Sequence, residues 1–169
     1  IIRKHGGHIA VESAPGAGTT FTVYLPACDA GCAEAQADEG RIAGGKGRVL
    51  VMDDEPEVRE TVGAMLERLG YTVELVESGA RAVERYRESL QNTSPFDLVI
   101  MDLTVPGGMG GKEAIARLRE MDPGVRAIVS SGYANDPVMA NYAQYGFSGV
   151  VAKPFRLKDL SASVAAVMK

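Results

Sequence analysis

Five polar side chains in this sequence come directly after apolar segments, and their chemical types suit one shared task. The segments are short runs of aliphatic residues, typical of strands buried on both faces. The most regular run, Leu98 to Met101, ends in a carboxylate and is followed by a loop rich in proline and glycine. In chain order, the five side chains are Asp53, Asp54, Asp102, Ser130 and Lys153.

Together these side chains favour phosphoryl chemistry. Three carboxylates that converge repel one another unless a cation neutralises them. Oxygen ligands in a solvated cleft suit Mg²⁺, whereas the lack of histidine and cysteine beside them disfavours zinc. A magnesium ion beside a carboxylate is typical of phosphoryl transfer. We therefore predict Asp102 as a phosphoryl acceptor, with the Ser130 hydroxyl donating to a phosphoryl oxygen and Lys153 pairing with the carboxylates.

Each of these residues has an ordinary alternative role when taken alone. A single aspartate after a strand is usually a turn residue or a helix cap. Ser130 is unremarkable, and Ser131 beside it competes for the same role. A single lysine such as Lys153 is most often a solvated surface charge. The occurrence of all of them at the ends of successive strands favours the site.

A regular alternation of strand and helix patterns positions these residues. The predicted strands are 48–52, 72–76, 98–101, 125–129 and 147–151, and the predicted helices are 56–69, 78–90, 111–121, 137–145 and 157–168. Such an alternation predicts an α/β fold with a doubly wound, five-stranded parallel sheet. The carboxyl ends of its strands meet at one edge, where ligands bind in this architecture. Pro154 sharpens the turn that aims Lys153, and the bond between them is a candidate for the cis form.

The first 47 residues follow a different pattern. Residues 1–26 predict a short helix end and a β-hairpin, with turn residues between two alternating segments. Residues 27–47 contain hardly any large apolar side chain and predict a flexible linker. Cys28 and Cys32 fall in this linker, where free reduced thiols are favoured over a redox or metal role.

Composition narrows the class of protein. The chain has 169 residues and a formal net charge of −4, which argues against a dedicated nucleic-acid binder. No apolar run approaches the ~20 residues of a membrane span, and no signal peptide opens the chain. These features indicate a cytoplasmic segment, and the missing initiator methionine suggests a piece of a longer protein, whose other parts can be attached to a membrane.

The site residues and their spacing resemble the receiver domain of response regulators over residues 48–169. The resemblance implies a flavodoxin-like sheet with strand order 2-1-3-4-5 and transfer of a phosphoryl group from a phosphohistidine to Asp102. It implies that Asp53 and Asp54, together with Asp102 and the backbone carbonyl of Thr104, hold Mg²⁺. Ser130 then corresponds to the switch hydroxyl of the family and Lys153 to its lysine.

One position departs from the family pattern. The family places an aromatic switch residue on the last strand, where this sequence has Val150. A ring that rotates into the space beside the hydroxyl is therefore missing. This puts the usual output coupling in question, although it does not affect phosphorylation.

The segment HGGHIAVESAPGAGTTFTVYLP resembles the C-terminal end of the ATP-binding domain of sensor histidine kinases. The nucleotide-binding boxes of that family are missing, so we expect no kinase activity from this chain itself. His5 and His8 match a helix end of that domain and are not expected to be phospho-acceptors. Both resemblances together indicate the C-terminal part of a hybrid sensor histidine kinase, whose parent chain is a protein-histidine kinase.

The expected partners are the phospho-acceptor domain of a histidine kinase or a histidine phosphotransfer protein. Two alternatives stay open: a receiver that only regulates its attached kinase as a protein-binding module, and a degenerate receiver that is never phosphorylated. Without its sheet, the hairpin exposes apolar residues on edge strands. It is then disordered, packs on the receiver, or pairs with a second copy of the chain to form a dimer.

Overall fold

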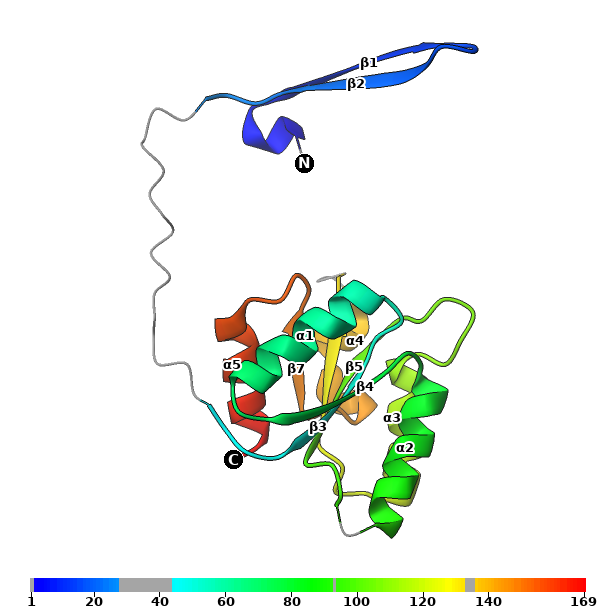
Figure 1. Cartoon of the computed structure of the whole chain (residues 1–169), viewed down its shortest axis with the longest axis vertical. Helices are drawn as coiled ribbons and strands as arrows, with labels where there is room; N and C mark the ends of the chain where they lie inside the picture. The colour runs from blue at the N-terminus through cyan, green and yellow to red at the C-terminus, as the bar shows by residue number, and fades with distance from the viewer. Residues whose placement is uncertain (1, 28–43, 93, 133–135) are drawn as a thin grey trace. The chain divides into compact units, whose positions relative to one another are not determined.

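The computed structural model describes residues 2–27, 44–92, 94–132 and 136–169 (Figure 1). The chain divides into two compact units, Ile1–Glu39 and Gly40–Lys169. Most of the predicted linker, including Cys28 and Cys32, lies outside the described residues.

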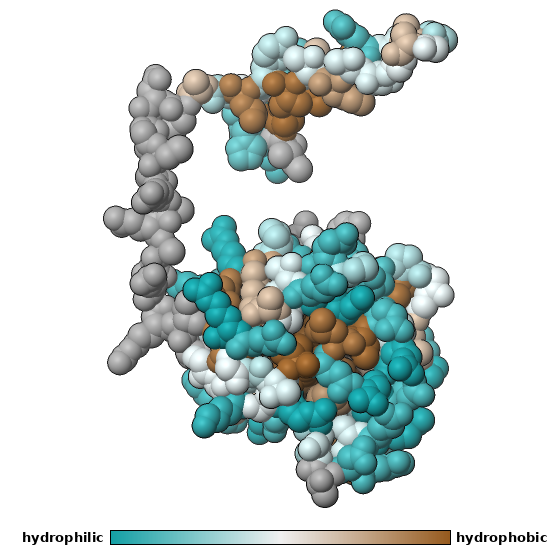
Figure 2. Space-filling view, viewed as in Figure 1, coloured by the Kyte–Doolittle hydropathy of each residue, from teal (hydrophilic) through white to brown (hydrophobic). Residues whose placement is uncertain are grey.

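The first unit contains the predicted β-hairpin. A short 3-10 helix, η1 (Ile2–His5), precedes the antiparallel strands β1 (His8–Ala14) and β2 (Gly18–Tyr24). In this register Ile9 is opposite Val23 and Val11 is opposite Phe21, so these four side chains share one face. All four are exposed, and Figure 2 shows an apolar band along the hairpin.

The second unit is the predicted doubly wound α/β domain. Its five parallel strands are β3 (Arg48–Met52), β4 (Thr72–Val76), β5 (Leu98–Asp102), β6 (Ala127–Ser131) and β7 (Gly149–Ala152). They lie in the order β4-β3-β5-β6-β7, which confirms the predicted strand order. The helices are α1 (Pro56–Arg68), α2 (Gly79–Gln91), α3 (Gly111–Met121), α4 (Pro137–Ala140), the 3-10 helix η2 (Tyr142–Tyr145) and α5 (Leu157–Val167).

The helices cover both faces of the sheet, which explains the continuous apolar strands. Successive side chains of β5 point to opposite faces, so Val99 and Met101 pack with α2 and α3, whereas Leu98 and Ile100 pack with α1 and α5. Each such buried side chain stabilises the fold by roughly 1.5–3 kcal/mol relative to exposure. Figure 1 shows β5 in the middle of the sheet with helices on both faces. Asp102 is the last residue of this buried strand.

Several element boundaries differ from the sequence prediction by one or two residues, among them that of β7, which begins at Gly149 instead of residue 147. Two other differences change the description of the fold. Strand β6 begins at Ala127 and continues to Ser131, two residues beyond the predicted end, because it pairs with β5 and β7 on either side. The predicted helix 137–145 is interrupted at Asn141, whose side-chain amide donates to the Pro137 carbonyl at 3.1 Å. Only one α-helical turn precedes the interruption, and a 3-10 turn follows it.

Candidate functional site

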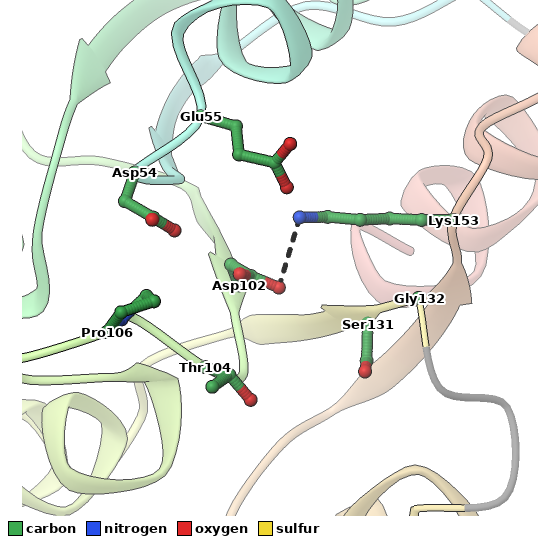
Figure 3. A pocket seen from close by; sticks show the side chains of 8 residues that line it. All are labelled: Asp54, Glu55, Asp102, Thr104, Pro106, Ser131, Gly132 and Lys153. Atoms are coloured by element: carbon green, nitrogen blue, oxygen red, sulfur yellow. Dashed lines mark ion pairs between the residues drawn. The ribbon is translucent and has the colours of Figure 1, made fainter. Parts of the chain in front are cut away.

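A cavity of about 480 Å³ lies at the carboxyl ends of the central strands. Figure 3 shows Asp54, Asp102 and Lys153 converging on it from three different loops and strand ends. The described residues that line the cavity are Asp54, Glu55, Asp102, Thr104, Pro106, Ser131, Gly132 and Lys153. The parallel sheet brings these residues together because every strand ends at the same edge.

Lys153 joins two of the predicted carboxylates. Its Nζ atom lies 2.7 Å from Oδ2 of Asp53 and 3.2 Å from Oδ1 of Asp102. Lys153 follows β7, and its position is fixed by a backbone bond from its N–H to the Ser131 carbonyl at 2.9 Å. The peptide bond between Lys153 and Pro154 is cis, as the sequence suggested.

Asp53 is the most enclosed of the three carboxylates, with 2 % of its surface exposed. Its Oδ1 atom accepts a hydrogen bond from the Glu55 N–H at 3.1 Å, while Oδ2 pairs with Lys153. Its backbone N–H donates to the Val76 carbonyl of β4 at 3.2 Å. The carbonyl of Asp53 accepts a bond from Nη1 of Arg59 on α1 at 2.6 Å.

The charges of this cluster suit a divalent cation. One ligand oxygen from each of Asp53, Asp54 and Asp102 lies within 4.8 Å of the others. Three negative charges and the positive charge of Lys153 leave a net charge of −2. A site with three carboxylate oxygens and no nitrogen or sulfur ligand fits Mg²⁺, which prefers hard oxygen ligands.

The surroundings of Asp102 disfavour its charged form. Burial raises the pKa of the Asp102 carboxyl, Lys153 lowers it, and the charges of Asp53 and Asp54 raise it further, so that the net shift is upward. Burial alone would lower the pKa of Lys153, but its hydrogen bonds and ion pairs with Asp53 and Asp102 outweigh burial and raise it. Lys153 therefore stays charged in the neutral range, beside an acid that gains stability when another cation approaches.

The structure corrects the predicted position of the hydroxyl group. The Ser130 hydroxyl is buried and donates to the Met101 carbonyl of β5 at 3.4 Å, away from the cavity. Ser131 lines the cavity instead (Figure 3). Because side chains alternate along a strand, the two-residue extension of β6 decides which of the two serines faces the carboxylates.

Thr104 and Val150 are the other residues that the sequence singled out. Thr104 lines the cavity two residues after Asp102. Val150 is half-buried in β7 and packs against the core on the side of α3 and α4. Gly132, expected to flank the site, lines the cavity as well. Glu55 and Pro106 also line it, although nothing in the sequence pointed to them except their positions beside Asp54 and in the loop after Asp102.

An acidic cleft at the carboxyl edge of a flavodoxin-like sheet, with a lysine bridging two of its carboxylates, defines the class of this protein as a receiver fold. A family model described as "Response regulator receiver domain" matches residues 49–165. The chain belongs to this family.

Relatives of two kinds match the chain. It is 33% identical to the sensor kinase CckA of Brucella abortus (strain 2308) over 178 residues, which cover 100% of this chain and 18% of that protein. It is 34% identical to the chemotaxis protein CheY of Bacillus subtilis (strain 168) over 110 residues, covering 64% of this chain and 87% of CheY. The chain thus spans about a fifth of the length of CckA.

Solved receiver structures share the fold. The receiver domain of a sensor histidine kinase from Pseudomonas aeruginosa PAO1, with a magnesium ion coordinated in its active-site cleft, has a TM-score of 0.60 and 28% identity, covering 70% of this chain and 93% of that one. The response regulator TrrA from Thermotoga maritima, in complex with Mg²⁺ and BeF, has a TM-score of 0.62 and 26% identity, covering 72% and 98%.

The unit Gly40–Lys169 is therefore a receiver domain of two-component signalling, similar to the receivers of hybrid histidine kinases. None of the helices in the described ranges combines the length and the apolar character that a membrane span requires.

Proposed function

We propose that Asp102 accepts the phosphoryl group in this receiver. An oxygen of the Asp102 carboxylate attacks the phosphorus of a phosphohistidine, and an acyl phosphate forms. The bond between phosphorus and the imidazole nitrogen breaks, its electron pair stays on that nitrogen, and a proton from solvent neutralises the imidazole. The observation that carries this proposal is the position of Asp102 in the cavity, 3.2 Å from Lys153 and beside Asp53 and Asp54.

Lys153 and Ser131 provide donors around the transferred group. The ammonium of Lys153 pairs with the carboxylates at rest and donates to a phosphoryl oxygen after transfer, because both partners are anionic. The Ser131 hydroxyl takes the role that the sequence had assigned to Ser130, since it lines the cavity at the end of β6.

Asp53, Asp54, Asp102 and the Thr104 carbonyl would hold Mg²⁺. When bound, the ion neutralises charge that develops on the phosphoryl oxygens. The donor chemistry of the cluster and its net charge of −2 support this assignment. The magnesium-bound receivers of similar fold support it further.

Incubation with acetyl phosphate and magnesium, followed by intact-protein mass spectrometry, tests the acceptor. The wild-type chain should gain one phosphoryl mass, and Asp102→Asn should gain none. Asp159→Asn, which removes an exposed aspartate of α5, should behave as wild type. No gain on wild type, or an equal gain on Asp102→Asn, would refute the proposal.

The two neighbouring serines provide a matched pair for the hydroxyl. Ser131→Ala should slow labelling of Asp102 by about 100-fold, in the range of one lost transition-state donor. Ser130→Ala should leave the labelling rate within about 2-fold of wild type and lower the free energy of unfolding by about 1 kcal/mol, because it loses only the buried bond to Met101. The reverse pattern would restore Ser130 to the site.

We also propose that this receiver belongs to a hybrid sensor histidine kinase and exchanges phosphate with a histidine on a kinase domain or a phosphotransfer protein. The alignment with CckA covers the whole chain, including the hairpin, and the sensor histidine kinase AruS of Pseudomonas aeruginosa aligns over 99% of it. Labelling of the purified chain by a phosphorylated histidine phosphotransfer protein tests the exchange. Labelling by acetyl phosphate alone would favour the alternative of a regulatory module without onward transfer.

A further inference from the structure

Arg59 is a polar residue of α1 whose side chain contacts the site without lining its cavity. Its Nη1 atom donates to the carbonyl oxygen of Asp53 at 2.6 Å, and the contact is partly buried. Arg59 is the fourth residue of α1, and its backbone N–H donates to the Glu55 carbonyl at 3.0 Å. Both its main chain and its side chain are thus bonded to the loop that carries Asp53 and Asp54.

That loop is short and otherwise held at its first residue. Only Asp53, Asp54 and Glu55 separate the end of β3 from Pro56, the first residue of α1. The other polar groups of Asp53 are bonded to the Val76 carbonyl, the Glu55 N–H and Lys153. The hydrogen bond from Arg59 holds the remaining polar group of Asp53, its backbone carbonyl.

The Asp53 carbonyl belongs to the peptide unit that leads into Asp54. Because the peptide unit is planar, a bond that holds its carbonyl also fixes the direction of the following N–Cα bond. That direction limits where the Asp54 side chain can point. A guanidinium suits this task because its hydrogen bonds are charge-assisted and its planar fork is rigid.

We propose that Arg59 is a positioning residue that orients the peptide between Asp53 and Asp54, so that the Asp54 carboxylate faces Asp102 before a divalent cation binds. This inference rests on the proposed function of the site as a Mg²⁺ site. Its direct consequence is that Arg59 helps to keep the three mutually repelling carboxylates together, whose ligand oxygens lie within 4.8 Å of one another.

A role of Arg59 through its charge and a role through positioning predict opposite changes in Mg²⁺ affinity when its side chain is removed. Arg59 brings a positive charge to the edge of an acidic cluster, and a nearby positive charge opposes binding of another cation. If only its charge mattered, Arg59→Ala would bind Mg²⁺ more tightly than wild type. If Arg59 positions the loop, the same variant binds Mg²⁺ more weakly, because the carboxylates must be gathered during binding.

Isothermal titration of the 169-residue chain with MgCl₂ measures this difference. We expect Arg59→Ala to raise the Kd for Mg²⁺ by about 10-fold, which is typical when a group that orients metal ligands is lost. Arg59→Lys keeps the charge and one donor, and should recover part of the affinity. Arg68→Ala removes an exposed arginine from the last turn of the same helix and is the matched control, with wild-type affinity expected.

Amide hydrogen exchange in metal-free protein gives a second measurement that does not depend on magnesium. The Glu55 N–H is bonded to Oδ1 of Asp53, so its exchange should accelerate in Arg59→Ala and stay unchanged in Arg68→Ala. Exchange across β5 should not change, which separates a local effect from global unfolding. If Arg59→Ala does not fold, Arg59→Lys and Arg59→Gln provide the same two measurements.

Unchanged or tighter binding of Mg²⁺ by folded Arg59 variants would overturn the positioning role. That outcome is distinguishable from failure of the proposed function. If wild type itself neither binds Mg²⁺ nor gains a phosphoryl mass at Asp102, the site assignment fails. If wild type does both and Arg59→Ala matches it, only the inference about Arg59 fails.

Discussion

At the scale of single residues, Asp102 is held in surroundings that disfavour its charged form. Burial and the charges of Asp53 and Asp54 raise its pKa despite the contact with Lys153. Local destabilisation of this kind is common at functional sites, because the same groups that repel one another bind the ligand. If the proposed Mg²⁺ site is correct, relief of this repulsion contributes to the affinity for the ion.

Neutralisation of Asp102 should stabilise the metal-free protein. At pH 7 with chelator present, we expect Asp102→Asn to raise the free energy of unfolding by about 1 kcal/mol, measured by urea denaturation. The unfolded aspartate titrates near its ordinary pKa of about 3.9, and the folded one titrates higher. The penalty in wild type therefore grows as pH rises between these two values and disappears below the lower one.

The dependence of this stability difference on pH and on Mg²⁺ tests whether the charge of Asp102 causes it. The advantage of Asp102→Asn should be constant near pH 7, shrink as pH falls through the raised pKa, and vanish below about pH 4. Saturating Mg²⁺ should reverse it, because ligand at 100 times its Kd stabilises wild type by about 2.7 kcal/mol. A variant that is less stable than wild type at pH 7 without metal would contradict the unfavourable charge.

Most residues of the site could be predicted because each follows a conspicuous apolar strand. Asp102 and Lys153 are unambiguous, since each is the charged residue that ends or follows such a run. Ser130 and Ser131 are not, because the sequence offers two adjacent hydroxyls and the strand end depends on pairing with neighbouring strands. Arg59 gave no signal, because a helical arginine among acidic residues is usually a solvated charge.

At the scale of elements, the segment that precedes β3 is hydrogen-bonded to the turn between α1 and β4. The Gly45 N–H donates to the Leu69 carbonyl at 2.9 Å, and the Thr72 N–H donates to the Gly47 carbonyl at 2.9 Å. The sequence predicted only a linker for this segment, because close contact between two backbones leaves no apolar pattern to detect. The need for glycine at positions 45 and 47 becomes visible only from the neighbouring groups that pack against them.

Substitution of Gly45 should disrupt this contact. A Cβ atom at Gly45 would lie 2.1 Å from the hydroxyl oxygen of Tyr71, so either the segment or the ring must move. We expect Gly45→Ala to lower the free energy of unfolding by about 1–3 kcal/mol, the usual cost of overpacking, measured by urea denaturation. Gly132→Ala is the control, because a Cβ atom there meets nothing within 4 Å. Equal stability of both variants would contradict the tight contact.

The region of α4 shows where the prediction of elements reaches its limit. Residues 137–145 have a helical pattern, but the side chain of Asn141 bonds to the Pro137 carbonyl and a 3-10 turn follows. Such local competition between side chain and backbone decides helix length without changing hydrophobic periodicity. Val150 of β7, where the family pattern has an aromatic residue, is the other departure from expectation in this half of the receiver.

At the scale of the whole molecule, the hairpin and the receiver differ in how far they bury their apolar side chains. The receiver buries both faces of its sheet beneath helices. In the hairpin, Val11 is 59% exposed and Phe21 is 67% exposed, although they lie opposite each other on one face. A two-stranded sheet with such a face is marginally stable alone and has edges that can pair with another chain.

We therefore expect the hairpin to make the 169-residue chain associate with itself. Light scattering should show a mass that rises above the monomer mass of 17.9 kDa as concentration increases, whereas a chain of residues 44–169 stays monomeric. The double substitution Val11→Thr and Phe21→Thr keeps residues suited to strands and removes the apolar face, so it should restore the monomer. All three proteins should accept phosphate from acetyl phosphate equally, because the site lies within the receiver unit. A monomeric full-length chain at every concentration would show that the exposed face does not drive association.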